Sequence, residues 1–303
     1  MLNPLIELKN VHDPIHVIGA AGRSGRAVCT ALFKAGAPYV PLVRSLRKWQ
    51  ETGLPGEARI ADLSDHYSLS SALRDAVRVV SCAHARHAQA ILDATEPDVM
   101  LVLLGSTRRY TRWPDTHGLG VMQGERVLVG SGRQGVMLHP TMIYGAAGED
   151  NVQRLAALLQ RLPIVPLPGG GRSLVQPIYQ TDVTRCILSA LDRNWPEPES
   201  LIIAGPQPLP YADFVRAVAK AADLPAPRIV NAPLALLRLI APVTSFIPGI
   251  PSIESDEIRR LSEDKAFDIM PMFNRLGVNP VSLANGLAQT FGINISDSNF
   301  GRS

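Results

Sequence analysis

The sequence has little cysteine and no cluster of metal-binding residue types. Its three cysteines, Cys29, Cys82 and Cys186, are far apart and lie in apolar surroundings without the spacing of metal ligands. This spacing argues against a disulfide framework and against a zinc module, and no metal is expected. It predicts reduced core cysteines in a cytoplasmic protein.

Strong charge and long apolar runs are also missing. The net charge is only +3 and no nucleic-acid-binding motif accompanies it, so nucleic acid is not an expected partner. Residues 1–12 contain no basic segment followed by an apolar core, which argues against a secretion signal. The longest uncharged apolar stretch, 239–253, is interrupted by prolines and falls short of the ~20 apolar residues that a membrane span needs. We expect it to pack on the main domain, the alternatives being a cover for an apolar substrate or contact with a partner or membrane surface.

What the chain does contain is an alternation of short apolar runs with amphipathic stretches. With 303 residues and 46% hydrophobic composition, it can form one large or two modest domains around a sizeable core. The apolar runs predict buried strands and the stretches between them predict helices; the runs lie at 15–18, 39–43, 58–61, 77–81, 99–104, 136–139 and 201–204. The pattern predicts the α/β class with a doubly wound parallel sheet.

The same pattern suggests two parts. A Rossmann domain is expected over residues 11–145, completed by 176–204. In the second range, Asp182 or Thr181 is expected to begin a helix that runs through Leu191, because its side-chain oxygen can accept from the unpaired N–H groups of the first turn. From residue 205 onward the composition shifts to helices separated by prolines. We therefore expect 146–175 and 205–303 to form a smaller, mainly helical cap domain that holds a substrate.

The chain is organised around a glycine-punctuated turn between the first strand and the first helix. Gly19, Gly22 and Gly25 follow the apolar run at 15–18 and precede an amphipathic stretch that ends near residue 35. The missing side chains at Gly19 and Gly22 let backbone N–H groups approach a pyrophosphate at the positive helix N-terminus, while Gly25 lets the helix pack closely on the strand. The strand, turn and helix together predict a dinucleotide-binding site.

A cation rather than an acid follows the second strand. A site that prefers NAD places Asp or Glu about 20 residues after the glycines, whereas Arg44 stands at that place here. Arg23, inside the glycine turn, can form the other side of a phosphate clamp. The two arginines predict NADP as the cofactor, the alternative being a solvated basic loop.

The glycine spacing, G-x-x-G-x-x-G, resembles that of the extended and atypical short-chain dehydrogenase/reductases, which include NAD-dependent epimerase/dehydratase-like and NmrA-like proteins. The Asp62-Leu63 pair, the Pro140 to Gly145 segment and residues 175–183 also resemble this group, and the tail over 258–287 is similar to relatives of the 39-kilodalton subunit of respiratory complex I. The resemblance implies that Asp62 meets the adenine amino group and that Pro140 borders the nicotinamide. Small Ala83 suits a backbone that lies against the cofactor ribose. For Asp62, the alternative is a turn in which Ser64 or Asp65 caps the next helix.

The catalytic pattern of that family is incomplete in this chain. Ser106 falls where the family places a hydroxyl that polarises the substrate carbonyl, but no Tyr-x-x-x-Lys occurs anywhere. The alignment puts His117 at the tyrosine position and Val121 at the lysine position. His117 and Tyr110 are the candidate proton donors, since imidazole titrates near neutrality and a loop phenol can replace the lost one; each can instead be a surface or packing residue.

Two functions remain open on these residues. The first is an NADP(H)-dependent oxidoreductase or epimerase-like enzyme acting on a carbonyl or sugar-nucleotide-like small molecule. The second is a non-catalytic NADP(H)-binding sensor, assembly or structural protein, which the absence of the dyad favours. We expect the cations Arg108, Arg109 and Arg112 either to recognise an anionic substrate or to be solvated at the surface. The sequence leaves a homo-oligomer or a partner protein open.

Overall fold

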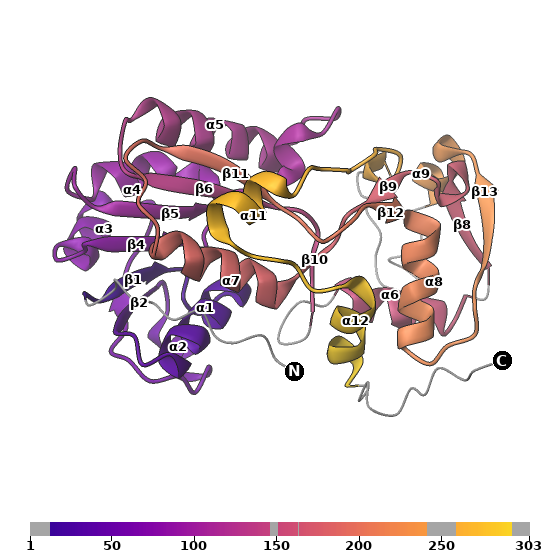
Figure 1. Ribbon diagram of the computed structural model, residues 1–303, viewed down its shortest axis with the longest axis horizontal. Helices are drawn as coiled ribbons and strands as arrows, with labels where there is room; N and C mark the ends of the chain where they lie inside the picture. Colours follow the sequence, from indigo (N-terminus) through magenta and orange to yellow (C-terminus); the bar gives the residue numbers. More distant parts are fainter. Residues whose placement is uncertain (1–12, 146–150, 163, 241–258, 293–303) are drawn as a thin grey trace.

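The computed structural model describes residues 13–145, 151–162, 164–240 and 259–292 (Figure 1). Its centre is a seven-stranded sheet with the order β11-β6-β5-β4-β1-β2-β3, in which every neighbouring pair is parallel. The strands are β1 (Ile15–Ile18), β2 (Tyr39–Val43), β3 (Arg59–Ile60), β4 (Arg78–Ser81), β5 (Met100–Leu104), β6 (Gly135–Pro140) and β11 (Glu199–Ile203). The order reverses between β1 and β4, so the doubly wound α/β sheet predicted from the sequence is confirmed.

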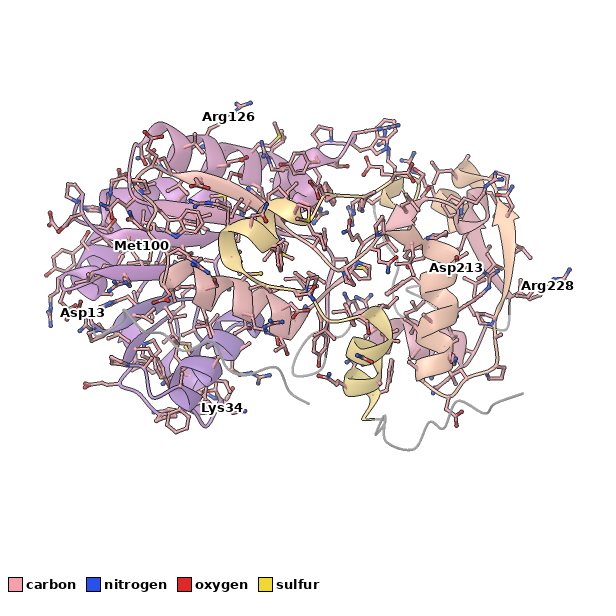
Figure 2. All side chains as sticks on the ribbon, viewed as in Figure 1. Asp13, Lys34, Met100, Arg126, Asp213 and Arg228 are labelled. Atoms are coloured by element: carbon pink, nitrogen blue, oxygen red, sulfur yellow. The ribbon has the colours of Figure 1, made fainter. Side chains whose placement is uncertain are left out.

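Helices cover both faces of this sheet, and its central strands, such as β5 (MLVLL), are therefore continuously apolar rather than alternating. On one face lie α1 (Arg23–Lys34), α7 (Gln180–Leu191) and α11 (Met270–Leu276), packed on a core that includes Val17, Val102 and Leu138. On the other lie α3 (His66–Leu73), α4 (Ala88–Asp93) and α5 (Thr116–Gly130), packed on Leu101 and Leu103. Outside these layers, charged side chains such as Lys34, Arg126 and Arg228 point away from the body (Figure 2).

A second part lies beside the carboxyl end of the sheet (Figure 1). It contains four helices, α6 (Asn151–Leu159), α8 (Tyr211–Ala221), α9 (Leu234–Ile240) and α12 (Leu283–Phe291), among the described residues. It also contains strand pairs that were not predicted, β8 (Ile164–Pro168) with β13 (Arg228–Ala232) and β9 (Leu174–Val175) with β12 (Leu209–Pro210). Prolines in β8 hide its strand character, because proline is confined to sheet edges. Residues 241–258 lie outside the described residues. They include most of the apolar stretch at 239–253 and the start of a helix that the sequence pattern predicts over 255–262.

Several local expectations need correction. The pattern of residues 83–94 predicts a single helix, but the structure has a 3-10 turn, η1 (Ala85–His87), followed by α4. Asp182 does not cap α7, which begins at Gln180 after Tyr179 and has no side-chain cap. Its carboxylate instead accepts from the Val281 N–H at 2.7 Å and from Arg185 at 2.8 Å, which ties α7 to the C-terminal segment. Asp182 therefore has an architectural role, as predicted, but it acts through these two contacts and not through a helix cap.

The C-terminal segment returns to the sheet (Figure 1). Helix α11 lies against β11 and α7, and Met272 and Leu276 are buried in the same core as β1. Part of the range expected to belong to the cap therefore completes the Rossmann part. The three cysteines are free, as predicted, and burial raises the thiol pKa of each. Among the described helices, none has the length and apolar character needed to cross a bilayer.

Candidate functional site

The glycine turn has the geometry that a bound pyrophosphate requires. Gly19 has a φ of +76°, a conformation that favours glycine, and its carbonyl accepts the Gly22 N–H at 2.9 Å. A Cβ on Gly25 would lie 2.2 Å from the Gly19 oxygen, so only glycine permits this approach of helix to turn. Gly22 is the N-cap of α1 and makes no side-chain cap, and the first turn carries no acid. The leading N–H groups of α1 thus form a cradle that fits an anionic dinucleotide.

The residues expected around the rest of the cofactor lie at the same edge of the sheet. Arg44 is exposed and directly follows β2, and Arg23 is exposed in the first turn of α1. Asp62 follows β3 and accepts from the Ser64 hydroxyl at 2.7 Å and the Ser64 N–H at 2.9 Å. These hydrogen bonds hold the pKa of Asp62 below its ordinary value, and the charge of Arg44 acts in the same direction. Asp65, not Ser64, caps α3 by accepting from two N–H groups.

Two further expected contacts also lie at this carboxyl edge. The Ala83 nitrogen would be 3.5 Å from a Cβ on Gly19, so the backbone after β4 passes beside the glycine turn. Pro140 ends β6, and its carbonyl accepts from the Thr107 hydroxyl at 3.1 Å. These positions suit residues that line a dinucleotide along the ends of parallel strands.

Ser106 is held in place by its backbone and its side chain. Its N–H donates to His139 Nδ1 at 3.1 Å, and its Oγ accepts from the Arg108 N–H at 3.2 Å, which caps the 3-10 turn η2 (Thr107–Tyr110). The hydroxyl proton of Ser106 takes no part in this cap and can be donated to a substrate oxygen. Gly105 is required here because a Cβ would lie 2.3 Å from His139 Nδ1.

A buried polar network supports the Ser106 backbone, and no local sequence pattern indicates this network. Because Nδ1 of His139 accepts, the neutral ring carries its proton on Nε2, which lies 3.0 Å from the Ser200 hydroxyl. Ser200 donates in turn to Glu125 at 2.5 Å, and Arg109 donates to the same carboxylate at 2.6 Å. Burial raises the pKa of Glu125, but the hydrogen bonds from His139 and Ser200 and the nearby positive charge outweigh it and lower the pKa overall. The carboxylate is therefore ionised.

The two candidate proton donors lie in different surroundings. Tyr110 is 48% exposed, receives a hydrogen bond from Arg109 at 3.0 Å and packs its ring 5.8 Å from that of Phe267. His117 lies in the first turn of α5, its ring edge-on to His84 with centroids 4.3 Å apart. The structure thus places the phenol beside the buried network and the imidazole beside the segment after β4.

The lysine position of the family is filled by the apolar core. Val121 is 1% exposed and belongs to the cluster between α5 and the sheet. It cannot supply an ammonium group to a neighbouring acid, so any catalysis here proceeds without that group.

Burial, reinforced by nearby positive charge, keeps His84 and His117 neutral near pH 7. Burial, followed by the charges of His117 and Arg86, lowers the pKa of His84 to about 4. Burial and the charge of Arg108 also lower the pKa of His117, and Asp115 opposes them in part. His84 is fixed further because its Nδ1 accepts the Arg86 N–H at 3.0 Å.

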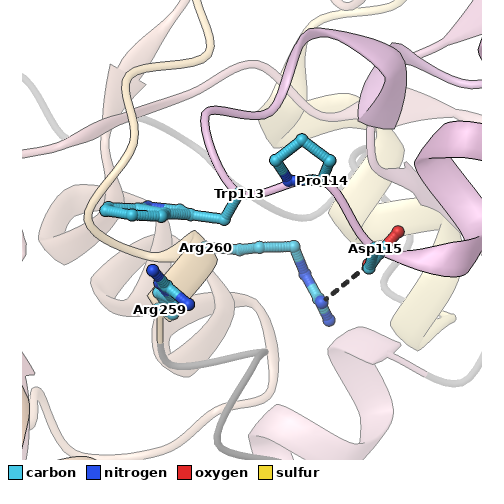
Figure 3. Close-up of a pocket in the computed structure, with 5 residues that line it drawn as sticks. All are labelled: Trp113, Pro114, Asp115, Arg259 and Arg260. Carbon is cyan, nitrogen blue, oxygen red and sulfur yellow. Dashed lines mark ion pairs between the residues drawn. The ribbon is translucent and has the colours of Figure 1, made fainter.

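The arginines near Tyr110 are partly neutralised inside the protein. Arg108 pairs with Asp115 at 2.5 Å and Arg109 pairs with Glu125, whereas Arg112 uses its N–H to bind the buried Glu263 carboxylate at 2.7 Å. Beside them lies a pocket of about 260 Å³, drawn in Figure 3 and lined by Trp113, Pro114, Asp115, Arg259 and Arg260. In this pocket the Arg259 guanidinium lies 3.5 Å from the Trp113 ring centroid. Within the described ranges, no group of three or more His, Cys, Asp or Glu residues is placed to hold a metal ion.

Comparisons with known proteins agree with this architecture. No family model matches the chain. Solved structures similar to it include UDP-glucuronic acid 4-epimerase from Bacillus cereus in complex with UDP-glucuronic acid and NAD, with a TM-score of 0.70, 18% identity and coverage of 93% of this chain and 98% of that one. UDP-glucose 4-epimerase from Thermotoga maritima with UDP-glucose has a TM-score of 0.69 at 14% identity, covering 93% and 98%. A nucleoside-diphosphate-sugar epimerase from Pseudomonas aeruginosa has a TM-score of 0.69 at 19% identity, covering 93% and 97%. The chain therefore has the fold of these sugar-nucleotide epimerases, the fold that the resemblance to extended reductases predicted.

Proposed function

We propose that the chain is an NADP(H)-dependent oxidoreductase or epimerase-like enzyme that acts on a small carbonyl or sugar-nucleotide-like substrate. The observation that carries this proposal is the glycine turn, whose close approach of Gly25 to Gly19 leaves the N-terminus of α1 open to a pyrophosphate. Ser106, Tyr110 and His117 all follow β5, at the carboxyl edge of the sheet, where folds of this kind bind ligands. The UDP-sugars and NAD named with the similar structures fit this class of substrate and cofactor.

The roles follow from the contacts of each residue. The bound cofactor would supply the oxidation and reduction chemistry. Ser106, fixed by His139, would donate its hydroxyl proton to the substrate oxygen, and His117 or Tyr110 would hold the proton that the reaction transfers. The buried network holds the Ser106 backbone through the bond from its N–H to His139, and this would fix the position from which the hydroxyl acts.

NADPH is expected to bind at least tenfold more tightly than NADH. Arg44 follows β2 where an acid would hold the ribose of NAD, and a charge-assisted contact to the 2′-phosphate contributes ~1.5–3 kcal/mol. Fluorescence titration with both cofactors measures this preference, which Arg44→Ala should remove. Arg47→Ala is the matched control, since Arg47 is exposed and pairs with Glu51 on α2 (Leu46–Gln50). Equal affinities in the parent protein would contradict the assignment of Arg44.

Substitution of the true proton donor is expected to remove turnover and leave NADPH affinity unchanged. If His117 donates, activity falls at least a hundredfold in His117→Phe and is retained in Tyr110→Phe; the reverse identifies Tyr110. If His117 is the donor, its protonated imidazole is the active form. The pKa of His117 is lowered from its ordinary value of about 6.5, so the activity should be lost as pH rises through a range below 6.5. Steady-state rates of both variants across pH test the assignment, and parental rates in both would exclude the two residues.

A second function, an NADP(H)-binding protein without catalysis, rests on Val121. Its place in the core removes the lysine that orders the family's proton donor. This candidate predicts tight NADPH binding together with no oxidation of NADPH by a panel of carbonyl compounds and sugar nucleotides. Turnover of any of these substrates that depends on Ser106 would exclude it.

A further inference from the structure

Two residues of the candidate site are joined to one buried carboxylate. Arg109 Nη1 donates to Glu125 Oε1 at 2.6 Å and also to the Tyr110 phenol oxygen at 3.0 Å. The Ser200 hydroxyl donates to the same Glu125 oxygen at 2.5 Å and belongs to the network that supports the Ser106 backbone. Glu125 therefore connects the phenol of Tyr110 with the backbone of Ser106.

The Arg109 guanidinium is fixed against Tyr110. Its Cζ lies 4.6 Å from the centroid of the Tyr110 ring, and its side chain is only 25% exposed. The ion pair with the buried Glu125 holds it in this place. Because the guanidinium has only donors, the phenol oxygen is the acceptor in their hydrogen bond, and the phenol proton stays available to a ligand.

The chain that follows Tyr110 is held as well. The Thr111 hydroxyl lies 2.8 and 2.9 Å from the two carboxylate oxygens of Glu263, and the Arg112 N–H donates to Glu263 at 2.7 Å. The Tyr110 ring packs 5.8 Å from the ring of Phe267. Glu263 and Phe267 both lie in the segment before α11, which thus fixes the turn while half of the Tyr110 side chain remains exposed.

His117, the other candidate donor, is placed differently. Its ring packs edge-on against His84, and burial lowers its pKa. The ring is therefore uncharged near pH 7, and a neutral imidazole gives up a proton far less readily than a phenol does. These contacts favour Tyr110 over His117 as the proton donor.

We propose that Tyr110 is the proton donor of the site and that Arg109, held by Glu125, positions its phenol and stabilises the phenolate left after donation. The inference rests on the proposed enzymatic function and identifies its acid. As a carbonyl is reduced, the phenol O–H bond breaks and an O–H bond forms on the carbonyl oxygen, while the carbonyl carbon takes a hydride from NADPH. The carbonyl is reduced, NADPH is oxidised, and the phenolate regains its proton from solvent. Its negative charge develops beside a guanidinium that is already in place, which stabilises it without reorganisation.

Nitration by tetranitromethane tests this assignment without substrate or cofactor, because the reagent attacks the phenolate form of tyrosine. Mass spectrometry of peptides gives the nitration rate of Tyr110 relative to that of Tyr67, which is 84% exposed on α3. We expect Arg109→Gln to lower this ratio about threefold, the size of a partly exposed charge contact. Loss of a side chain that only packs on the ring would uncover the ring and raise the ratio. An unchanged or raised ratio overturns the proposal.

Two further variants separate this effect from a loss of folding. Arg109→Gln combined with Glu125→Gln removes both charges, so neither stays buried and unpaired, and the ratio should fall as in the single variant. Arg108→Gln is the matched control from the same turn, since Arg108 pairs with Asp115, which keeps Arg260 as a second partner. Its ratio should equal that of the parent. A parental ratio in the double variant, or an equal fall in Arg108→Gln, overturns the proposal.

Steady-state kinetics test the positioning role with any carbonyl compound that the parent protein reduces. Arg109→Gln should lower kcat roughly tenfold or more and change KM by less than about twofold, because the contact strengthens as the phenolate forms. Arg109→Lys should restore part of kcat, since an ammonium group also stabilises the phenolate. A parental kcat in Arg109→Gln overturns the proposal. If no compound is reduced, the enzymatic function fails, whereas the nitration ratio still shows whether Arg109 stabilises the phenolate.

Discussion

Alanine at position 25 is expected to weaken NADPH binding roughly tenfold or more and to lower the free energy of unfolding by about 2 kcal/mol. The added Cβ would lie 2.2 Å from the Gly19 oxygen and 2.8 Å from its carbonyl carbon, and both are backbone atoms that cannot rotate away. Helix α1 must therefore move from the turn, which misaligns the N–H groups that bind the pyrophosphate. Fluorescence titration of NADPH and urea denaturation measure the two effects.

Gly130→Ala provides the matched control. Gly130 is also helical, at the end of α5, and an added Cβ meets nothing within 4 Å. Since glycine in a helix is less stable than alanine by ~0.5–1 kcal/mol, this variant should be as stable as the parent or slightly more so, with unchanged NADPH affinity. Parental NADPH affinity in Gly25→Ala would show that the cofactor does not bind at the glycine turn.

Removing the buried carboxylate of Glu125 is expected to destabilise the protein by about 3 kcal/mol in Glu125→Ala. The substitution leaves the charge of Arg109 without a partner in a largely buried place and removes the acceptor of the Ser200 hydroxyl. Because His139 links Ser200 to the Ser106 N–H, any activity should fall as well. Urea denaturation at pH 7 measures the loss of stability.

The destabilisation caused by Glu125→Ala should become smaller at low pH. The folded pKa of Glu125 is lowered, so its contribution is complete above the unfolded pKa of about 4.3 and is lost as pH falls through the folded value. The difference between the parent and Glu125→Ala should therefore shrink on acidification below about pH 4. Asp213→Ala, which breaks an exposed pair with Arg216, should change stability by less than ~0.5 kcal/mol. A Glu125→Ala protein as stable as this control would show that the network contributes nothing.

The sheet was predictable because its strands are short, apolar and separated by local signals. The strands at Ile15–Ile18 and Tyr39–Val43 were predicted with their observed bounds, since a glycine turn and a basic loop end them. The pairing of β8 with β13 was not predicted, because β8 contains prolines and its partner lies more than 60 residues later. Local propensity does not report such distant pairings.

The candidate site also contains residues that local patterns predict and residues that only the tertiary structure brings together. The glycine turn, Arg44 and Ser106 belong to local patterns, and the structure places them together at one edge of the sheet. The contact of His84 with His117 depends on how α5 packs on η1, and the contact of Glu263 with Thr111 joins residues 152 positions apart. Glu125 gave a weak signal, a lone acid on an otherwise apolar helix face, whereas Ser200 gave none. The partners of a charged residue depend on tertiary structure, and this is why the sequence did not predict that Arg108 and Arg260 both pair with Asp115.

The return of α11 to the sheet has a consequence for the order in which the protein can fold during its synthesis. Met272, Leu276 and Val278 belong to the same buried cluster as Ile15 and Val17 in β1. During synthesis, β1 therefore keeps part of its apolar surface uncovered until residues 272–278 have left the ribosome. Contacts between such distant residues form slowly and leave intermediates prone to association. A nascent chain of this protein would thus depend on α11 to complete the core around β1.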